Sequence, residues 1–162
     1  MKRILVPTDF SEQAENALKV AAQLAKKNES EIYVLNSLEL PTHLSSSGAN
    51  GAMPESLFFI KLAEKYFEEL LEKPYLEGLL IHEAIIGHGE VYKDVNEVVK
   101  EKNIDLVIMG SQGTNGFMEL FIGSNTEKVV RTSEIPVLVI KNNHEDFKTD
   151  NFVYATDFSE EC

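Results

Sequence analysis

The sequence predicts an α/β fold: an open five-stranded parallel sheet in the order 3-2-1-4-5, with helices on both faces. Short apolar segments alternate with segments whose apolar residues recur at helical spacing, which is the pattern of a strand–helix repeat. A polar turn follows the first apolar segment, and a glycine-rich stretch follows the fourth. In the order 3-2-1-4-5 these two stretches meet where the strand order reverses, which is where open parallel sheets bind ligands.

In the first part of the chain, residues 4–6 and 32–35 are short apolar runs that predict two strands. The segment between them carries alanines at helical spacing, and the sequence leaves either Asp9 or Ser11 as its N-cap. Serines and glycines gather in residues 40–54, so we expect a loop there before the next helix.

The remaining elements follow the same alternation. A helix after the loop carries an aromatic group that we expect in the core, namely Phe58, Phe59, Tyr66 and Phe67. Apolar runs predict three further strands at residues 79–86, 104–109 and 137–140. Helical spacing predicts helices at residues 90–102 and 125–131.

Composition limits the classes of function. Hydrophobic residues make up 43% of the chain and charged residues 26%, as in a folded domain. The formal net charge of -12 argues against a nucleic-acid partner, which requires clustered lysine and arginine. A single cysteine, Cys162, leaves no intrachain disulfide, and no signal peptide or membrane-length apolar run is visible. We therefore expect a cytoplasmic protein that binds neither nucleic acid nor membrane.

The end of the chain repeats its beginning. Residues 4–12 are Ile-Leu-Val-Pro-Thr-Asp-Phe-Ser-Glu, and residues 152–160 are Phe-Val-Tyr-Ala-Thr-Asp-Phe-Ser-Glu. The repeat begins about one domain length after the first copy. We therefore expect residues 1–141 to form one domain, residues 142–151 a linker, and residues 152–162 the truncated start of a second, tandem domain.

The glycine-rich stretch predicts a phosphate site. Gly110 and Gly113 are separated by two residues, and nine further residues lead to Gly123 at the start of a predicted helix. Glycines let the backbone approach a ligand, and a helix start offers free N–H groups and a positive dipole end to an anion. The residues expected to hold phosphate oxygens are Gly123, Ser124, Asn125 and Thr126.

Other features of the sequence favour holding a nucleotide over hydrolysing it quickly. The motif contains no lysine, so it is not a Walker A loop, and no general base stands beside it. Asp9 is either an acceptor for a ribose hydroxyl or a plain helix cap. The histidines show no metal-ligand spacing, so we assign no catalytic residue and no metal ligand of the protein itself.

Two separated motifs carry a family resemblance. Pro7-Thr8-Asp9-Phe10-Ser11, together with Met109-Gly110-x2-Gly113-x9-Gly123-Ser124, resembles the ATP-binding branch of the universal stress protein family. The resemblance covers residues 2 to about 141 and implies the Rossmann-like fold of the adenine nucleotide alpha hydrolases. It also implies bound ATP, or AMP or ADP, with Mg²⁺ or Mn²⁺ held by the phosphates.

The resemblance implies a role for each site residue. Around the adenosine it places Pro7 and Asp9, with Thr8 between them, and the backbone of Ser37. Along the ribose and α-phosphate it places Met109, Gly110 and Gly113. Beside the β- and γ-phosphates it places Gly123, Ser124, Asn125 and Thr126.

The resemblance also implies a homodimer through the edge strand Val137–Ile140, or pairing with the second repeat. The chain differs from the common family pattern at Asn36, Ser37 and Gln112. We expect a nucleotide-binding stress-response module that senses or stores ATP and signals through dimer or tandem-domain contacts. A slow ATPase or phosphotransfer enzyme, and a structural dimerisation domain with an idle pocket, are the alternatives, so enzymatic activity stays open.

Overall fold

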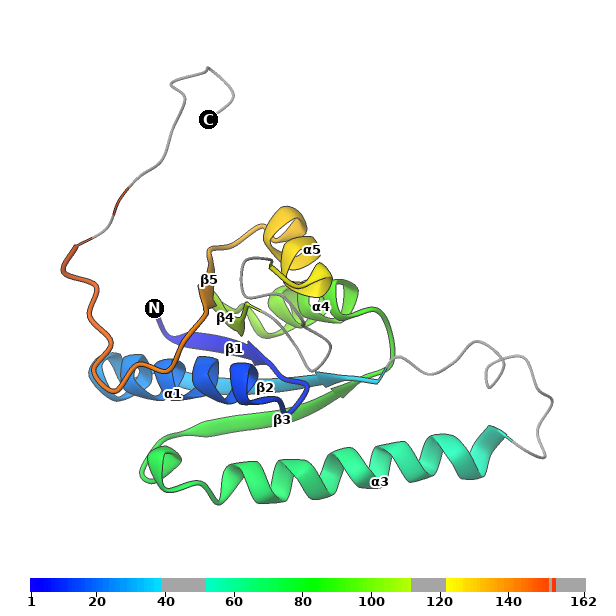
Figure 1. The fold of residues 1–162 in the computed structure, drawn as a ribbon. Coiled ribbons are helices and arrows are strands. Elements are labelled where there is room, and N and C mark those ends of the chain that lie inside the picture. Colours follow the sequence, from blue (N-terminus) through cyan, green and yellow to red (C-terminus); the bar gives the residue numbers. More distant parts are fainter. Residues whose placement is uncertain (39–51, 112–121, 152, 154–162) are drawn as a thin grey trace.

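The computed structural model describes residues 1–38, 52–111, 122–151 and 153 (Figure 1). The strands are β1 Arg3–Pro7, β2 Glu31–Ser37, β3 Ile81–Gly87, β4 Leu106–Gly110 and β5 Val137–Ile140. The helices are α1 Glu12–Asn28, α3 Ala52–Leu71, α4 Val91–Lys102 and α5 Ser124–Thr132, with a 3₁₀ turn, η1, at Pro74–Leu76. No helix among the described residues is long and apolar enough to cross a membrane.

The five strands form one sheet in the order β3-β2-β1-β4-β5, and each neighbouring pair is parallel. The predicted fold class and strand order are confirmed. One core lies between the sheet and the helices α1 and α3, and the other between the sheet and α4 and α5. In β1, Ile4 and Val6 enter the first core and Leu5 the second. Burial on both faces explains why these strands are continuous apolar runs in the sequence.

The start of α1 settles which residue caps it. The Ala14 N–H donates to Ser11 Oγ at 3.2 Å, so Ser11 is the N-cap. Asp9 accepts instead from the Ser11 N–H at 3.1 Å and shapes the turn before the helix. The predicted end of the loop at Pro54 is wrong, because α3 begins at Ala52. A proline in the first helical turn is tolerated, since the N–H that it lacks has no intrahelical partner there.

The aromatic group of α3 was predicted incorrectly in part. Phe67 is buried, but Phe58 is 61% exposed, Phe59 36% and Tyr66 41%. In Figure 1, α3 runs beside β3, which is an edge strand. A helix over a sheet edge buries only a narrow stripe, so apolar residues outside that stripe remain at the surface.

The segment after β5 turns back over α1 (Figure 1). The amide of Gln23 holds it at both ends: Nε2 donates to the His144 carbonyl at 2.7 Å, and the Phe147 N–H donates to Oε1 at 2.7 Å. The Phe147 ring packs against the core under α1. Residues 152 and 154–162, where the second copy was predicted, lie outside the described residues, so the tandem arrangement stays a prediction.

Candidate functional site

The strands β1 and β4 separate toward their carboxyl ends. Their ladder consists of the pairs Ile4–Leu106 and Leu5–Val107, while β4 continues to pair with β5 as far as Gly110. This is the point where the strand order reverses, because β1 continues toward β2 and β3 on one side and β4 toward β5 on the other. We call the region around these strand ends the carboxyl edge. It matches the position predicted for the ligand.

The turn that leaves β1 is held by its own side chains. The Phe10 N–H donates to Thr8 Oγ1 at 2.9 Å, and Asp9 Oδ1 accepts from the Ser11 N–H. Phe10 adopts a positive φ of 61°, which non-glycine residues rarely adopt. Its ring lies 5.2 Å from the rings of both Tyr66 and Phe67 on α3, and these contacts stabilise the turn. The Asp9 side chain remains exposed at this edge.

Gly110, at the end of β4, has a packing role that the sequence did not reveal. A Cβ atom at this position would lie 2.8 Å from the Gln13 carbonyl oxygen, which is a backbone atom of α1. Glycine therefore lets the first turns of α1 lie directly on β4. The prediction was that Gly110 makes room for a sugar or phosphate; the contact with α1 is a sufficient reason by itself. Gly113 lies outside the described residues.

The start of α5 is fixed to the end of β4. Thr126 Oγ1 donates to the Gly110 carbonyl at 2.9 Å in a buried hydrogen bond, so its hydroxyl hydrogen is not available to a ligand. The Gly123 N–H donates to the Ser111 carbonyl at 2.7 Å. The Ser111 N–H donates in turn to the Ile140 carbonyl at 2.9 Å. These bonds place the first turn of α5 at the carboxyl edge, beside β4.

The first turn of α5 offers backbone donors. Its N-cap is Gly123, and no side chain among the described residues caps the helix. The first intrahelical bond runs from the Glu127 N–H to the Gly123 carbonyl at 2.9 Å. The N–H groups of Ser124, Asn125 and Thr126 therefore have no carbonyl partner within the helix. Such groups, at the positive end of the helix dipole, suit a phosphate or carboxylate.

At the end of β2, two buried side-chain oxygens lack partners among the described residues: Asn36 Oδ1 and Ser37 Oγ. Asn36 is 7% exposed, and its Nδ2 donates to the Thr8 carbonyl at 2.8 Å. This bond joins the end of β2 to the turn that leaves β1. Met109 is only 5% exposed and packs in the core with α4 and α5, and its contact with a ligand stays a prediction.

A carboxylate that sequence reasoning missed lies at the end of β3. Asp94, in the first turn of α4, is 9% exposed and accepts from the Gly89 N–H at 3.1 Å. A Cβ atom at Gly87 would overlap with this carboxylate, so the Gly-His-Gly sequence leaves the space that Asp94 fills. The two glycines separated by one residue were the only sequence signal for it.

Two lysines, one on α4 and one on α5, share the Glu90 carboxylate. Lys93 Nζ lies 2.7 Å from Glu90 Oε1, and Lys128 of α5 lies 3.6 Å from Glu90 Oε2. The hydrogen bond from Lys93 is the main cause that lowers the pKa of Glu90, so this carboxyl is ionised at neutral pH. The three groups together keep one positive charge, which favours an anion near the start of α5.

Comparison with known proteins identifies the family. A model described as the universal stress protein family matches residues 1–141. The chain belongs to the universal stress protein family. The universal stress protein MJ0577 of Methanocaldococcus jannaschii is 34% identical over 159 residues, which cover 88% of this chain and 96% of the relative. Universal stress protein YxiE of Bacillus subtilis is 29% identical over 147 residues, which cover 86% and 98%.

Solved universal stress proteins share the fold. The structure of MJ0577 matches with a TM-score of 0.74 and 27% identity, covering 88% of this chain and 97% of that one. A universal stress protein from Archaeoglobus fulgidus, solved in complex with dAMP, matches with a TM-score of 0.56 and 20% identity, covering 87% and 98%. The resemblance drawn from the two sequence motifs is thereby confirmed at the level of family and fold.

Proposed function

We propose that this chain is an adenine-nucleotide-binding module of the stress response, which holds ATP or a related nucleotide at the carboxyl edge. The observation that carries the proposal is the start of α5, which has no side-chain cap among the described residues and lies at the end of β4, where β1 and β4 separate. The binding of dAMP by a universal stress protein of Archaeoglobus fulgidus supports it.

The residues present fit a nucleotide. The N–H groups of Ser124, Asn125 and Thr126 would bind phosphate oxygens. The exposed Asp9 carboxylate would accept a hydrogen bond from a ribose hydroxyl, beside the turn that its Oδ1 shapes. The described residues contain no cluster of acidic, histidine or cysteine side chains that would hold a metal ion. Mg²⁺ or Mn²⁺ would therefore be held through the phosphates, whose charge it would offset.

We propose retention of the nucleotide in preference to rapid turnover. The carboxylates at this edge, Asp9 and Asp94, each accept a backbone N–H and serve to shape their turns. Slow ATP hydrolysis is the second candidate, and a structural domain with an idle pocket is the third. Single-turnover measurements with ATP and Mg²⁺ distinguish retention from slow hydrolysis. Retention predicts that ATP dissociates from the protein many times faster than it is hydrolysed.

The sharpest test removes one backbone donor and leaves the helix intact. Ser124 is the first residue of α5, where proline is favoured because its missing N–H has no intrahelical role. Gly123 before it has φ -61° and ψ 148°, a conformation that a following proline permits. We expect Ser124→Pro to weaken ATP binding about tenfold in calorimetry, by loss of one hydrogen bond to a charged group.

The matched control is Ser124→Ala, which removes the exposed hydroxyl and keeps the N–H. We expect it to bind ATP within about threefold of the unmodified protein, because solvent already competes for that hydroxyl. Equal binding by the proline and alanine variants would remove the phosphate role of α5. No binding of ATP, ADP or AMP by the unmodified protein, with no nucleotide released on its denaturation, would contradict the proposed function itself.

We also propose that two copies pair through β5. This strand is the outer edge of the sheet, and an uncovered edge of this kind tends to add another strand. The Pro136 carbonyl accepts from the Val107 N–H, and the Ile140 carbonyl accepts from the Ser111 N–H. Backbone groups alternate in direction along a strand, so the N–H and carbonyl of Val139 point away from β4. Val139→Pro removes an outward N–H and spares the sheet. Light scattering should report a dimer for the unmodified protein and a monomer for this variant; a dimer in both would exclude β5 pairing.

A further inference from the structure

Ser37, the last residue of β2, has a buried hydroxyl that pairs with none of the described residues. Buried polar groups in folded proteins are nearly all hydrogen-bonded, because an unpaired one lowers stability. The hydroxyl can both donate and accept, so its lack of a partner is unusual for so adaptable a group. An unpaired group of this kind at a ligand-binding edge indicates that its partner arrives with the ligand.

The position of Ser37 relative to β1 explains where such a partner would lie. The pairing of β1 with β2 ends at Pro7–Leu35, and the Thr8 N–H donates to the Leu35 carbonyl at 2.8 Å. Beyond this bond β1 has turned toward α1, while β2 continues for two more residues. Ser37 therefore lies beside the space that β1 leaves. Asn36 holds the turn in place there through its bond to the Thr8 carbonyl.

The distance from Ser37 to the phosphate donors fits one nucleotide. β2 and β4 flank β1, so they are two strand spacings apart, about 10 Å. A nucleotide with its phosphates at α5, beside β4, would therefore have its base at the end of β2. Ser37 is half-buried as a residue although its Oγ is covered, so contact with a base would require rotation about its one side-chain bond.

We propose that Ser37 Oγ accepts a hydrogen bond from the exocyclic amine of a bound adenine, which makes Ser37 a specificity-determining residue. The proposal rests on the proposed nucleotide site. It adds a side-chain contact with the base to the backbone contacts that the family resemblance implies.

The first test uses the protein without ligand. If the Ser37 hydroxyl has a partner only when a ligand is bound, Ser37→Ala removes an unpaired buried group from the free protein. We then expect Tm to rise by about 2 to 4 °C. The control is Ser30→Ala at the other end of the same strand. Ser30 is 4% exposed, and its Oγ donates to the Met1 carbonyl at 3.1 Å, so we expect its removal to lower Tm. A fall in Tm for Ser37→Ala would show that the hydroxyl is structural and would overturn the proposal.

The second test measures base selection by calorimetry with two ligands, ATP and the purine ribonucleoside triphosphate that lacks the 6-amino group. We expect the unmodified protein to bind ATP about tenfold more tightly than the analogue. In Ser37→Ala that ratio should fall to about twofold, because the variant has lost the acceptor for the amine. Ser30→Ala should keep the ratio of the unmodified protein.

The outcomes separate this proposal from the proposed function. ATP binding by both proteins with the same ratio would overturn the role of Ser37 and leave the nucleotide site intact. A lower ratio in Ser37→Ala alone would support the role. Failure of the unmodified protein to bind either ligand would overturn the nucleotide site and the role of Ser37 together.

Discussion

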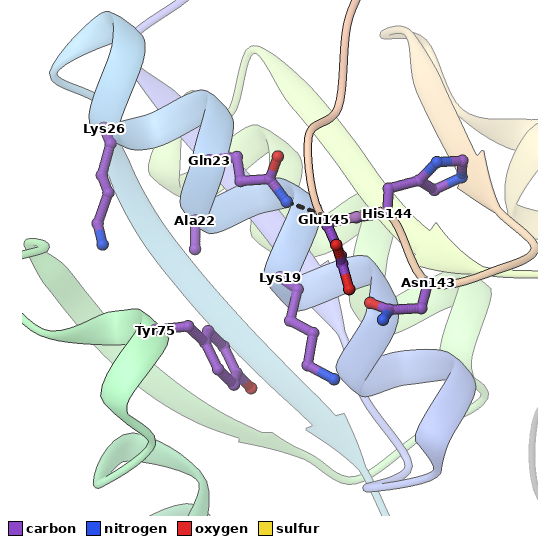
Figure 2. Close-up of a pocket in the computed structure, with 8 residues that line it drawn as sticks. All are labelled: Lys19, Ala22, Gln23, Lys26, Tyr75, Asn143, His144 and Glu145. Carbon is purple, nitrogen blue, oxygen red and sulfur yellow. Dashed lines mark hydrogen bonds between the residues drawn. The ribbon is translucent and has the colours of Figure 1, made fainter.

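Two regions of the molecule, at opposite ends of α1, invite comparison as ligand sites. The carboxyl edge lies at the start of α1, near the Thr8–Phe10 turn and the first turn of α5. The second region, the α1 hollow, has a volume of about 350 Å³ and lies between the second half of α1, η1 and the segment after β5 (Figure 2). Its lining residues are Lys19, Ala22, Gln23, Lys26, Tyr75, Asn143, His144 and Glu145.

The α1 hollow has volume, and two of the polar side chains that line it, Lys19 and Gln23, already have partners. Lys19 lies 3.6 Å from Glu15, and both atoms of the Gln23 amide are bonded to the chain that forms one wall. The Tyr75 hydroxyl, also in the lining, is buried without a partner among the described residues, and burial, followed by the nearby Glu15, raises its pKa. The tyrosine therefore stays neutral.

The carboxyl edge differs from the hollow in its backbone donors. Helix N–H groups and two side-chain oxygens at the end of β2 lack partners there among the described residues. Donors and acceptors that the fold holds in place without partners indicate a ligand more directly than empty volume does. We therefore interpret the α1 hollow as a by-product of docking the segment after β5 on α1, and we propose the carboxyl edge as the site of a polar ligand.

The largest expected effect comes from Gly110→Ala at the carboxyl edge. Its new Cβ would lie 2.8 Å from a backbone oxygen of α1, which cannot move away without shifting the helix. We expect the free energy of unfolding to fall by about 3 kcal/mol, measured by urea denaturation.

The matched glycine beside the α1 hollow is Gly78, between η1 and β3. Nothing lies within 4 Å of a Cβ there, and only its positive φ of 75° opposes a side chain. Gly78→Ala should lower the free energy of unfolding by about 1 kcal/mol. Equal losses for the two variants would show that the contact with α1 is not the reason for glycine at 110. Since Gly110 variants disturb the fold, Ser124→Pro is the cleaner probe of the nucleotide site.

The second prediction removes the bond that positions α5. Thr126→Val deletes a buried hydroxyl and leaves the Gly110 carbonyl without that donor, so unfolding should require about 2 kcal/mol less free energy. ATP binding should weaken as well, because the first turn of α5 loses its fixed place. Thr132→Val is the control on the same helix, since its hydroxyl donates to the Lys128 carbonyl and accepts from Asn96 Nδ2, and both bonds are exposed to solvent. It should change stability by less than about 0.5 kcal/mol; a similar loss in both would contradict a special role for Thr126.

Elements fixed by local pattern were predictable from the sequence, and β5 has the predicted bounds, Val137–Ile140. Strands buried on both faces leave continuous apolar runs, and the helices that cover them leave apolar residues at helical spacing. What could not be predicted depends on partners far along the chain. The contact between Gly110 and α1 is one example, and the stacking of Phe10 on α3 is another. Spacing shows that a glycine is present but not which backbone atom it faces.

The candidate site shows the same division. The sequence predicted that the turn at Thr8–Asp9 and the start of α5 would share one edge, because topology alone brings them there. The unpaired hydroxyl of Ser37 was not predictable, since a serine in the sequence carries no sign of whether its hydroxyl is satisfied. The binding roles of the individual residues stay predictions.

The third prediction releases the wall of the α1 hollow. Gln23→Ala removes both bonds to the segment at 144–147, so trypsin should cleave after Lys148 several times faster, with about 1 kcal/mol lost from stability. Gln23→Glu keeps an acceptor for the Phe147 N–H but loses the donor to His144, and should fall between the two. ATP binding should not change in either variant. Weaker ATP binding would mean that the two regions are coupled and that the hollow is more than a by-product.

The smallest effect concerns the amino end of the sheet, where the polar groups are satisfied. The Asp105 carboxylate accepts from the backbone N–H groups of Lys2 and Arg3, and these bonds lower its pKa. Because the folded pKa lies below the unfolded value of about 3.9, the stabilisation is complete above that pH and disappears as pH falls through the folded pKa. Since Asp105 is exposed, its contribution is below about 1 kcal/mol.

Asp105→Asn should therefore reduce the free energy of unfolding by a small, constant amount between pH 7 and pH 5, and the difference from the unmodified protein should shrink below about pH 4. Asp146→Asn, which removes only a surface pairing with Lys148, provides the baseline for a charge change of the same sign. A difference that persists undiminished to about pH 2.5 would show that the carboxyl is held by its shape and not its charge. β1 therefore begins at residues whose N–H groups bond to Asp105, and it separates from β4 toward its carboxyl end. The same strand connects the end of the sheet where these polar groups are paired with the end where the proposed ligand site lies.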